Sequence, residues 1–190
     1  QFPMRDTFRK IKSMFYYNAL QQIDNHNIYV ADGVYDRAGR KNNLREAEEC
    51  VRLVFEHIEK HPDRSLGIIA FSESQQAAIE EQITARRERQ PQYEWFFDES
   101  RDEPFFIKNL ENVQGDERDI IIFSIGYAEN EDGKVYSNFG SLSAEGGENR
   151  LNVAITRAKS KIIVVTSIEP EALKVDTSKN LGPKLLRKYL

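Results

Sequence analysis

The chain has 190 residues, of which 39% are hydrophobic and 31% are charged, proportions that are ordinary for a soluble globular domain with a substantial core. No apolar stretch is long enough to span a bilayer and no signal-peptide pattern opens the chain, while a single cysteine, Cys50, excludes an internal disulfide and indicates the cytoplasm. The formal net charge of −4 excludes a domain that grips duplex DNA over its whole surface, so any nucleic-acid site must be local.

Short apolar runs alternate with helical periods along the chain. Residues 1–27 are polar and aromatic, with a weak helical period over residues 8–20. Asn43 and Ser72 stand where N-caps are expected, before helices that run to about residues 59 and 89. A third helix is expected from about residue 147 and a short one after Gly182. Strands are predicted at residues 28–31, 66–71, 105–108, 119–125 and 161–166. This alternation predicts a parallel α/β sheet flanked by helices.

Residues 146–158, with the sequence GGENRLNVAITRA, place two arginines seven residues apart at the start of the expected third helix. Seven residues are nearly two turns, so the guanidinium groups of Arg150 and Arg157 should leave the same face. Arginine is always protonated and its planar fork matches phosphate oxygens, so this face suits phosphate charge. The alternative is an amphipathic helix whose arginines are merely solvated.

A second segment, residues 106–124, joins a polar loop, Gln114-Gly115-Asp116-Glu117, directly to an apolar strand. A continuous apolar run of this kind is typical of a central parallel strand that is buried on both faces. Ligands of open parallel sheets bind near strand ends. This loop precedes its strand, however, so that rule does not locate a site.

The two segments, in this order, resemble motifs V and VI of superfamily 1 helicases, and most of all the branch of the nonsense-mediated-decay helicases. That branch has a Gln-Gly-x-Glu loop before a strand and then Arg-Leu-Asn-Val-Ala-x-Thr-Arg-Ala, which residues 114–117 and 150–158 match. Residues 103–115 and 138–140 further resemble a bacterial subgroup of large proteins, which often carry a Vsr-like endonuclease domain. The resemblance begins near residue 28.

The resemblance implies a RecA-like P-loop NTPase fold, a parallel sheet flanked by helices, and the second RecA-like domain of an ATP-dependent helicase or translocase. The chain contains no Gly-x-x-x-x-Gly-Lys-Ser/Thr phosphate loop. ATP and Mg²⁺ should therefore be held mainly by a first RecA-like domain elsewhere in a longer protein, and this fragment alone should be inactive. The expected division is an extension or linker at residues 1–27, the RecA-like domain at 28–170 and a partly helical tail at 171–190. The expected partner is single-stranded DNA, with RNA left open, and no membrane.

This resemblance assigns six residues to the nucleotide, which are Arg157, Arg150, Glu117, Gly115, Gln75 and Gln76. Arg157 matches the arginine that reaches the γ-phosphate, an arginine finger that can accelerate phosphoryl transfer by ~10³–10⁵. Arg150 either contacts the nucleotide or holds the cleft together. Glu117 matches the acid that accepts a hydrogen bond from the ribose, and its alternative is a surface ion pair with Arg118 or Lys108.

The neighbouring polar residues are assigned to nucleotide coupling and to nucleic acid. Gln114 and Gly115 match the coupling loop, where Gly115 provides either a positive φ or a close backbone approach. Asn112 either donates to a nucleic-acid phosphate or caps its turn. Ser72 and Ser74 either touch a nucleic-acid backbone or cap the following helix.

The strand and helix that contain Gln75 and Gln76 match motif IV, with one departure. Many relatives have an arginine, a second phosphate contact, at the position of Gln76. The neutral amide supplies no charge, so Arg157 is expected to act alone or with Arg150. This departure favours an alternative function, an ATP-dependent switch that binds nucleic acid without unwinding and controls a linked nuclease. A third alternative is an α/β interaction domain with no nucleotide role.

A histidine pair and an aromatic group also have patterns that occur in binding sites. His57 and His61 have zinc-like spacing on a helix, but no third ligand is evident, so no metal site is predicted. The aromatic group at residues 93–97 either stacks bases or packs a loop onto the core, and packing is the preferred interpretation.

Overall fold

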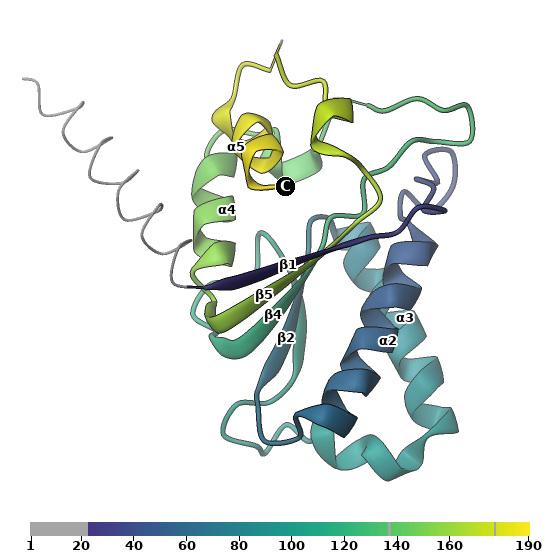
Figure 1. Ribbon diagram of the computed structural model, residues 1–190, viewed down its shortest axis with the longest axis vertical. Coiled ribbons are helices and arrows are strands. Elements are labelled where there is room, and N and C mark those ends of the chain that lie inside the picture. Colours follow the sequence, from purple (N-terminus) through teal and green to yellow (C-terminus); the bar gives the residue numbers. More distant parts are fainter. Residues whose placement is uncertain (1–22, 137, 177) are drawn as a thin grey trace, which may run out of the picture.

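The computed structural model describes residues 23–136, 138–176 and 178–190. Within them, five strands form one sheet in the order β1-β5-β4-β2-β3, and every neighbouring pair is parallel (Figure 1). The strands are β1 (Asp24–Tyr29), β2 (Leu66–Ala70), β3 (Phe106–Asn109), β4 (Arg118–Ser124) and β5 (Ala158–Thr166). This is the RecA-like α/β architecture that the sequence predicts.

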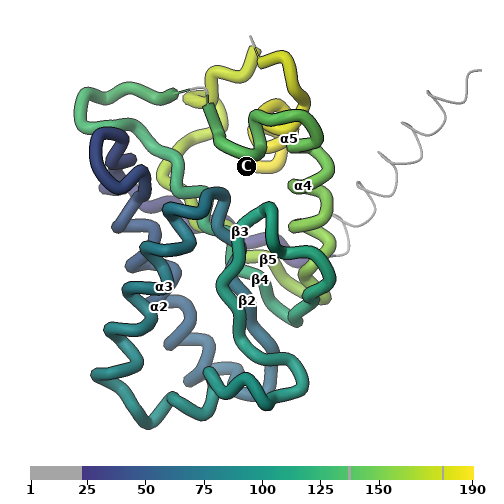
Figure 2. The backbone as a smooth tube through the Cα atoms, turned by 180° about the vertical axis from the view of Figure 1, so that it is seen from behind, coloured from purple at the N-terminus to yellow at the C-terminus, as the bar shows by residue number. Residues whose placement is uncertain are grey.

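Helices cover both faces of the sheet, as Figures 1 and 2 show from opposite sides. On one face lie α2 (Leu44–Lys60) and α3 (Glu73–Arg89), and on the other lie α4 (Gly147–Ile155) and α5 (Leu181–Tyr189). The 3₁₀ turns are η1 (Pro91–Phe97), η2 (Gly140–Leu142) and η3 (Pro170–Ala172). The predicted caps are confirmed, because the Asn43 and Ser72 side chains accept from the first turns of α2 and α3.

The alternation of β4 explains why its centre, residues 120–123, is apolar without interruption. Ile120 and Ile122 pack toward α2 and α3, whereas Ile121 and Phe123 pack toward α4 and α5. Successive side chains of a strand point to opposite faces, so a strand covered on both sides needs apolar residues at every position.

The connection from β3 to β4 contains no helix. Residues 110–117 return to the start of β4, and Leu110 and Val113 are buried in the same cluster as Leu151 and Ile155 of α4. The Gln114–Glu117 loop is therefore attached to the α4 side of the sheet through buried neighbours.

Some predicted boundaries are wrong. The first strand begins at Asp24, not at residue 28, because an edge strand with polar residues Asn25 to Asn27 gives no apolar run. The predicted arginine helix ends at Ile155, so Arg157 lies outside it, and β5 starts at Ala158, not at residue 161. The helical period predicted at residues 8–20 lies outside the described residues. None of the helices in the described ranges is both long and apolar enough to cross a membrane.

Candidate nucleotide and nucleic-acid sites

Arg157 and Glu117 meet at the amino edge of the sheet. Each residue immediately precedes a strand, and β4 and β5 are paired from Arg118 and Ala158 onward. The Arg118 amide also donates to the Arg157 carbonyl at 3.0 Å. Strand pairing therefore brings residues 114–117 and 150–158 together, and Arg157 Nη1 lies 3.8 Å from Glu117 Oε1.

The Arg157 guanidinium is oriented by two hydrogen bonds. Its Nε donates to the Val153 carbonyl and its Nη2 to Thr156 Oγ1, both at 3.1 Å. The Nη1 to Glu117 distance is too long for a hydrogen bond, so this is a loose ion pair. The Arg157 side chain is 18% exposed and that of Glu117 is 54% exposed. One guanidinium nitrogen thus remains available to an anion beside an accessible carboxylate.

Arg118 supports this arrangement from below the surface. Its guanidinium donates to the Pro104 and Glu117 carbonyls and lies 4.8 Å from the centre of the Phe106 ring. Burial lowers the pKa of Arg118. Lys108 pairs instead with Asp116, so neither of the surface partners expected for Glu117 is bound to its carboxylate.

The loop before Glu117 is exposed and is held in place by its backbone conformation. Gly115 has a φ of +93°, and a Cβ built there would meet no atom within 4 Å. Of the two roles considered for this glycine, positive φ is the one that its geometry requires. The side chains of Asn112 and Gln114 are exposed on the same loop.

Arg150 and Arg157 do not form one cationic face. The Nη1 of Arg150 donates to the carbonyls of Ser141 and Glu145, at 3.3 and 3.1 Å. Arg150 therefore ties residues 141–145 to the first turns of α4, while Arg157 lies beyond the opposite end of that helix. These bonds hold one loop of the domain, and the two predicted roles of Arg150, contacting the nucleotide and holding the cleft together, both stay predictions.

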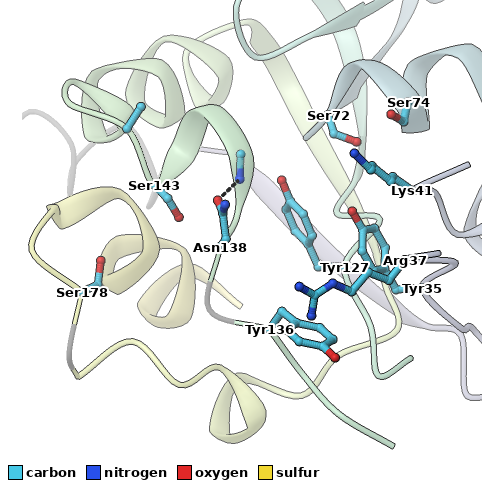
Figure 3. A pocket seen from close by; sticks show the side chains of 12 residues that line it. Tyr35, Arg37, Lys41, Ser72, Ser74, Tyr127, Tyr136, Asn138, Ser143 and Ser178 are labelled. Atoms are coloured by element: carbon cyan, nitrogen blue, oxygen red, sulfur yellow. Dashed lines mark hydrogen bonds between the residues drawn. The ribbon is translucent and has the colours of Figure 1, made fainter. Parts of the chain in front are cut away.

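A cleft of about 1010 Å³ opens at the carboxyl edge of the sheet (Figure 3). Ser72 and Ser74, at the start of α3, lie on one side of it, and Ser143 and Ser178 lie on the other. Asn112, Gln114, Glu117 and Arg157 do not line it. The residues predicted to bind ligands thus occupy more than one surface.

The chain matches the AAA_12 family, whose description is AAA domain, over residues 3–169. It belongs to this family. It is 40% identical over 174 residues to Uncharacterized ATP-dependent helicase MG140 of Mycoplasma genitalium, a match that covers 86% of the chain and 15% of that protein. It is 33% identical over 138 residues to Helicase sen1 of Schizosaccharomyces pombe, covering 70% and 7%.

These matches show that the AAA_12 domain is helicase-like and similar to ATP-dependent helicases. The chain spans about 15% of the length of the MG140 protein. A solved C-terminal domain of a possible DNA helicase from Lactobacillus plantarum gives a TM-score of 0.45 at 14% identity, over 82% of this chain and 81% of that one.

The AAA_12 domain also contains a buried polar network around Gln75 and Glu46, which the sequence analysis did not predict. Gln75 is fully buried, donates to the Asn43 carbonyl and Ser124 Oγ, and accepts from the Asn43 amide. Glu46 is fully buried and accepts from the Gly126 amide at 2.7 Å, from Ser124 and from Asn43. Asn43 and Glu46 have the spacing of a capping box, and this spacing was the only sequence signal that could have indicated a structural role for Glu46.

Gln75 and Gln76, the glutamines of the segment that resembles motif IV, differ in burial and in hydrogen-bond partners. Gln75 has no exposed surface, so it fixes the start of α2 against β4 and has no face that could touch a nucleotide directly. Gln76 is half-buried, with its amide donating to Glu80 and the Ile107 carbonyl and accepting from Asn109. Its polar atoms are already occupied within the domain.

The histidines and aromatic residues are structural. His57 Nε2 bonds the Arg64 carbonyl at 2.9 Å, burial lowers the His57 pKa, and no group of three metal-ligating side chains occurs within the described residues. Phe96 is buried, and Phe97 packs against Phe55. The aromatic segment therefore packs a loop onto the core, as preferred from the sequence.

Proposed function

We propose that this AAA_12 domain is the second RecA-like domain of an ATP-dependent superfamily 1 helicase or translocase that acts on single-stranded nucleic acid. The observation that carries the proposal is the Arg157–Glu117 pair, because two segments 40 residues apart with helicase motif sequences meet at 3.8 Å. The names of the relatives, ATP-dependent helicase MG140 and Helicase sen1, support the same activity.

The residues present fit one side of a nucleotide. Arg157 is a fixed cation with one nitrogen free of hydrogen bonds, and Glu117 is an exposed acceptor next to it. In the proposed site Arg157 neutralises γ-phosphate charge and Glu117 accepts from a ribose hydroxyl, while Gly115 sets the shape of the loop. ATP supplies the phosphoryl bond whose hydrolysis drives movement.

The remaining nucleotide contacts belong, in this proposal, to a first RecA-like domain. The chain has no phosphate-loop sequence, so that domain would hold most of the ATP and the Mg²⁺. Closure of the two domains on ATP would alternate their grip on a nucleic-acid strand, with Asn112, Gln114, Ser72 and Ser74 as candidate contacts. Arg150 would keep the loop before α4 in position, and the fragment alone would not hydrolyse ATP.

The test is ATP hydrolysis by the complete gene product, with and without single-stranded DNA, in the wild type and the Arg157→Ala variant. We expect stimulated turnover that falls by at least about 10³-fold in the variant while ATP binding is retained. The control is Arg89→Ala, because Arg89 is exposed at the end of α3. Full turnover in Arg157→Ala would contradict the assignment and direct attention to Arg150.

A second function is favoured by Gln76. Because its amide is neutral and bonded within the domain, the site lacks the second arginine of a two-arginine clamp. A domain with weaker phosphate neutralisation suits an ATP-dependent switch that controls a linked nuclease. ATP binding that alters nucleic-acid affinity, without turnover in the wild type, would support this function over a motor.

A further inference from the structure

We infer that the cleft at the carboxyl edge of the sheet binds a single strand of nucleic acid, with phosphates on Arg37 and Lys41 and a base stacked against Tyr35 and Tyr136. The inference rests on the proposed function for the class of ligand. It adds a binding surface that involves none of the residues at the Arg157–Glu117 pair, and it can be tested without ATP.

The cleft is positively charged, although the whole chain is negatively charged. The net charge is −4, yet the described residues that line the cleft include two cations and no carboxylate. Neither Arg37 nor Lys41 takes part in an ion pair within the described ranges. Two unneutralised cations in a concave surface attract an anionic ligand.

The loop that carries both cations is tightly organised. The Asp36 carboxylate accepts from the Gly39 and Arg40 amides at 2.8 and 2.7 Å, and these bonds lower its pKa. The Lys41 amide donates to the Asp36 carbonyl at 2.7 Å, and Lys41 has a φ of +56°. A non-glycine residue in this region costs about 1–2 kcal/mol. The loop thus holds Lys41 in place and satisfies the Asp36 carboxylate internally.

Tyr35 and Tyr136 provide a stacking surface, and the buried Tyr127 supports it. Tyr127 is anchored to the core, because its ring packs at 5.1 Å edge-on to Phe139 and at 6.0 Å against Tyr35. Opposite this pair, the Arg37 guanidinium lies 3.4 Å above the Tyr136 ring (Figure 3). Tyr35 and Tyr136 are half-buried and keep exposed surface. Aromatic rings and arginine planes beside cations are how proteins bind unpaired bases along a charged backbone.

Hydroxyl groups complete the lining. Ser74, Ser143 and Ser178 face the cleft from three segments of the chain, and such groups commonly contact phosphate and sugar. A duplex keeps its bases stacked inside and cannot use the tyrosines, so the lining favours a single strand. An acidic peptide would use the cations alone.

The experiment is fluorescence anisotropy with the 190-residue chain and fluorescein-labelled 12-nucleotide strands of deoxythymidine or uridine, from 50 to 200 mM salt. The Arg37→Gln/Lys41→Gln double variant should bind at least about tenfold more weakly, with the slope of log affinity against log salt reduced by roughly 1.4 for two phosphates. Tyr136→Leu should weaken binding roughly 5- to 100-fold with an unchanged slope. The ratio of the two strands assigns DNA or RNA.

The matched control is Arg40→Gln, which removes one charge from the same loop at a residue that pairs with Glu81 and does not line the cleft. It should bind within about twofold of the wild type. The assay contains no ATP and neither Arg157 nor Glu117 lines the cleft, which separates failure of this inference from failure of the proposed motor.

Three results would overturn the inference: no binding by the wild type, equal binding of a 12-base-pair duplex, or competition by polyglutamate as strong as that by the strands. Arg37 and Lys41 are exposed, so their variants should keep the wild-type melting temperature, which circular dichroism checks. Variants that melt normally and bind like Arg40→Gln would also overturn it.

Discussion

Glu46 should make the stability of this domain fall as the pH rises through neutrality. Its carboxyl group is fully buried, and desolvation raises its pKa from 4.5 to about 7, although hydrogen bonds from Gly126 and Ser124 oppose the rise. The group therefore titrates near neutral pH when folded and near pH 4.5 when unfolded. The perturbation that isolates this effect is Glu46→Gln, which keeps the shape and removes the titration.

The sign follows from proton binding. Between about pH 4.5 and pH 7 the folded state holds more protons on Glu46 than the unfolded state, so the free energy of unfolding falls as the pH rises. Below this window the contribution is fully favourable, and above it the loss is complete. Each tenfold change in a dissociation constant is worth about 1.4 kcal/mol, so the shift from 4.5 to about 7 corresponds to a loss of ~3 kcal/mol.

Urea unfolding of the wild type and Glu46→Gln at pH 5, 6, 7 and 8 measures this difference. At pH 5 the unfolded group is already about three-quarters ionised, so the variant should gain ~2.5 kcal/mol relative to the wild type between pH 5 and pH 8, whatever its absolute stability. Other groups, including His57, titrate in both proteins and cancel. Parallel pH profiles for the two proteins would refute the reasoning, since Glu46 would then not change protonation on unfolding in this range.

Three further changes have defined outcomes. Arg118→Met should lower the free energy of unfolding in urea by ~3 kcal/mol, because the Pro104 and Glu117 carbonyls lose a buried charged donor; a cost no larger than that of Arg89→Met would contradict this. Cys50 is buried and burial raises its pKa, so a thiol reagent at pH 8 should modify it only as fast as the domain opens, and fast labelling of the folded chain would show otherwise. Arg150→Ala should weaken strand binding in the cleft by severalfold by freeing residues 141–145, and unchanged affinity in the anisotropy assay would limit Arg150 to a local role.

The sheet could be predicted from sequence because its central strands carry a strong signal. β2 and the centre of β4, residues 120–123, are apolar in sequence and buried, as cover on both faces demands. β1 was misplaced by four residues because an edge strand is paired on one side only and tolerates polar residues. The local sequence pattern therefore predicted the strands that lie in an apolar environment. It failed for β1, whose extent is set by its pairing with β5.

The candidate sites divide in the same way. The motif sequences predicted Arg157 and Glu117 as site residues, but only the pairing of β4 with β5 brings their side chains to 3.8 Å from each other. The burial of Gln75 could not be predicted, since its partners Asn43 and Ser124 lie 32 and 49 residues away. Arg37 and Lys41 gave no signal at all, because two cations in a polar loop look like any solvated surface until the fold sets tyrosines beside them.

The arrangement around α4 gives the two proposed surfaces a physical connection. This nine-residue helix is about 13 Å long at 1.5 Å per residue. At its start, Arg150 is bonded to the Ser141–Glu145 segment, which contributes Ser143 and Ala144 to the cleft. Near its end, Val153 in the last turn and Thr156 just beyond it orient the Arg157 guanidinium. Leu151, Ala154 and Ile155 are buried against the sheet, so α4 is one packed element that touches both proposed surfaces. Its two ends thus link the loop that Arg150 holds to the Arg157 guanidinium without any direct contact between the two surfaces.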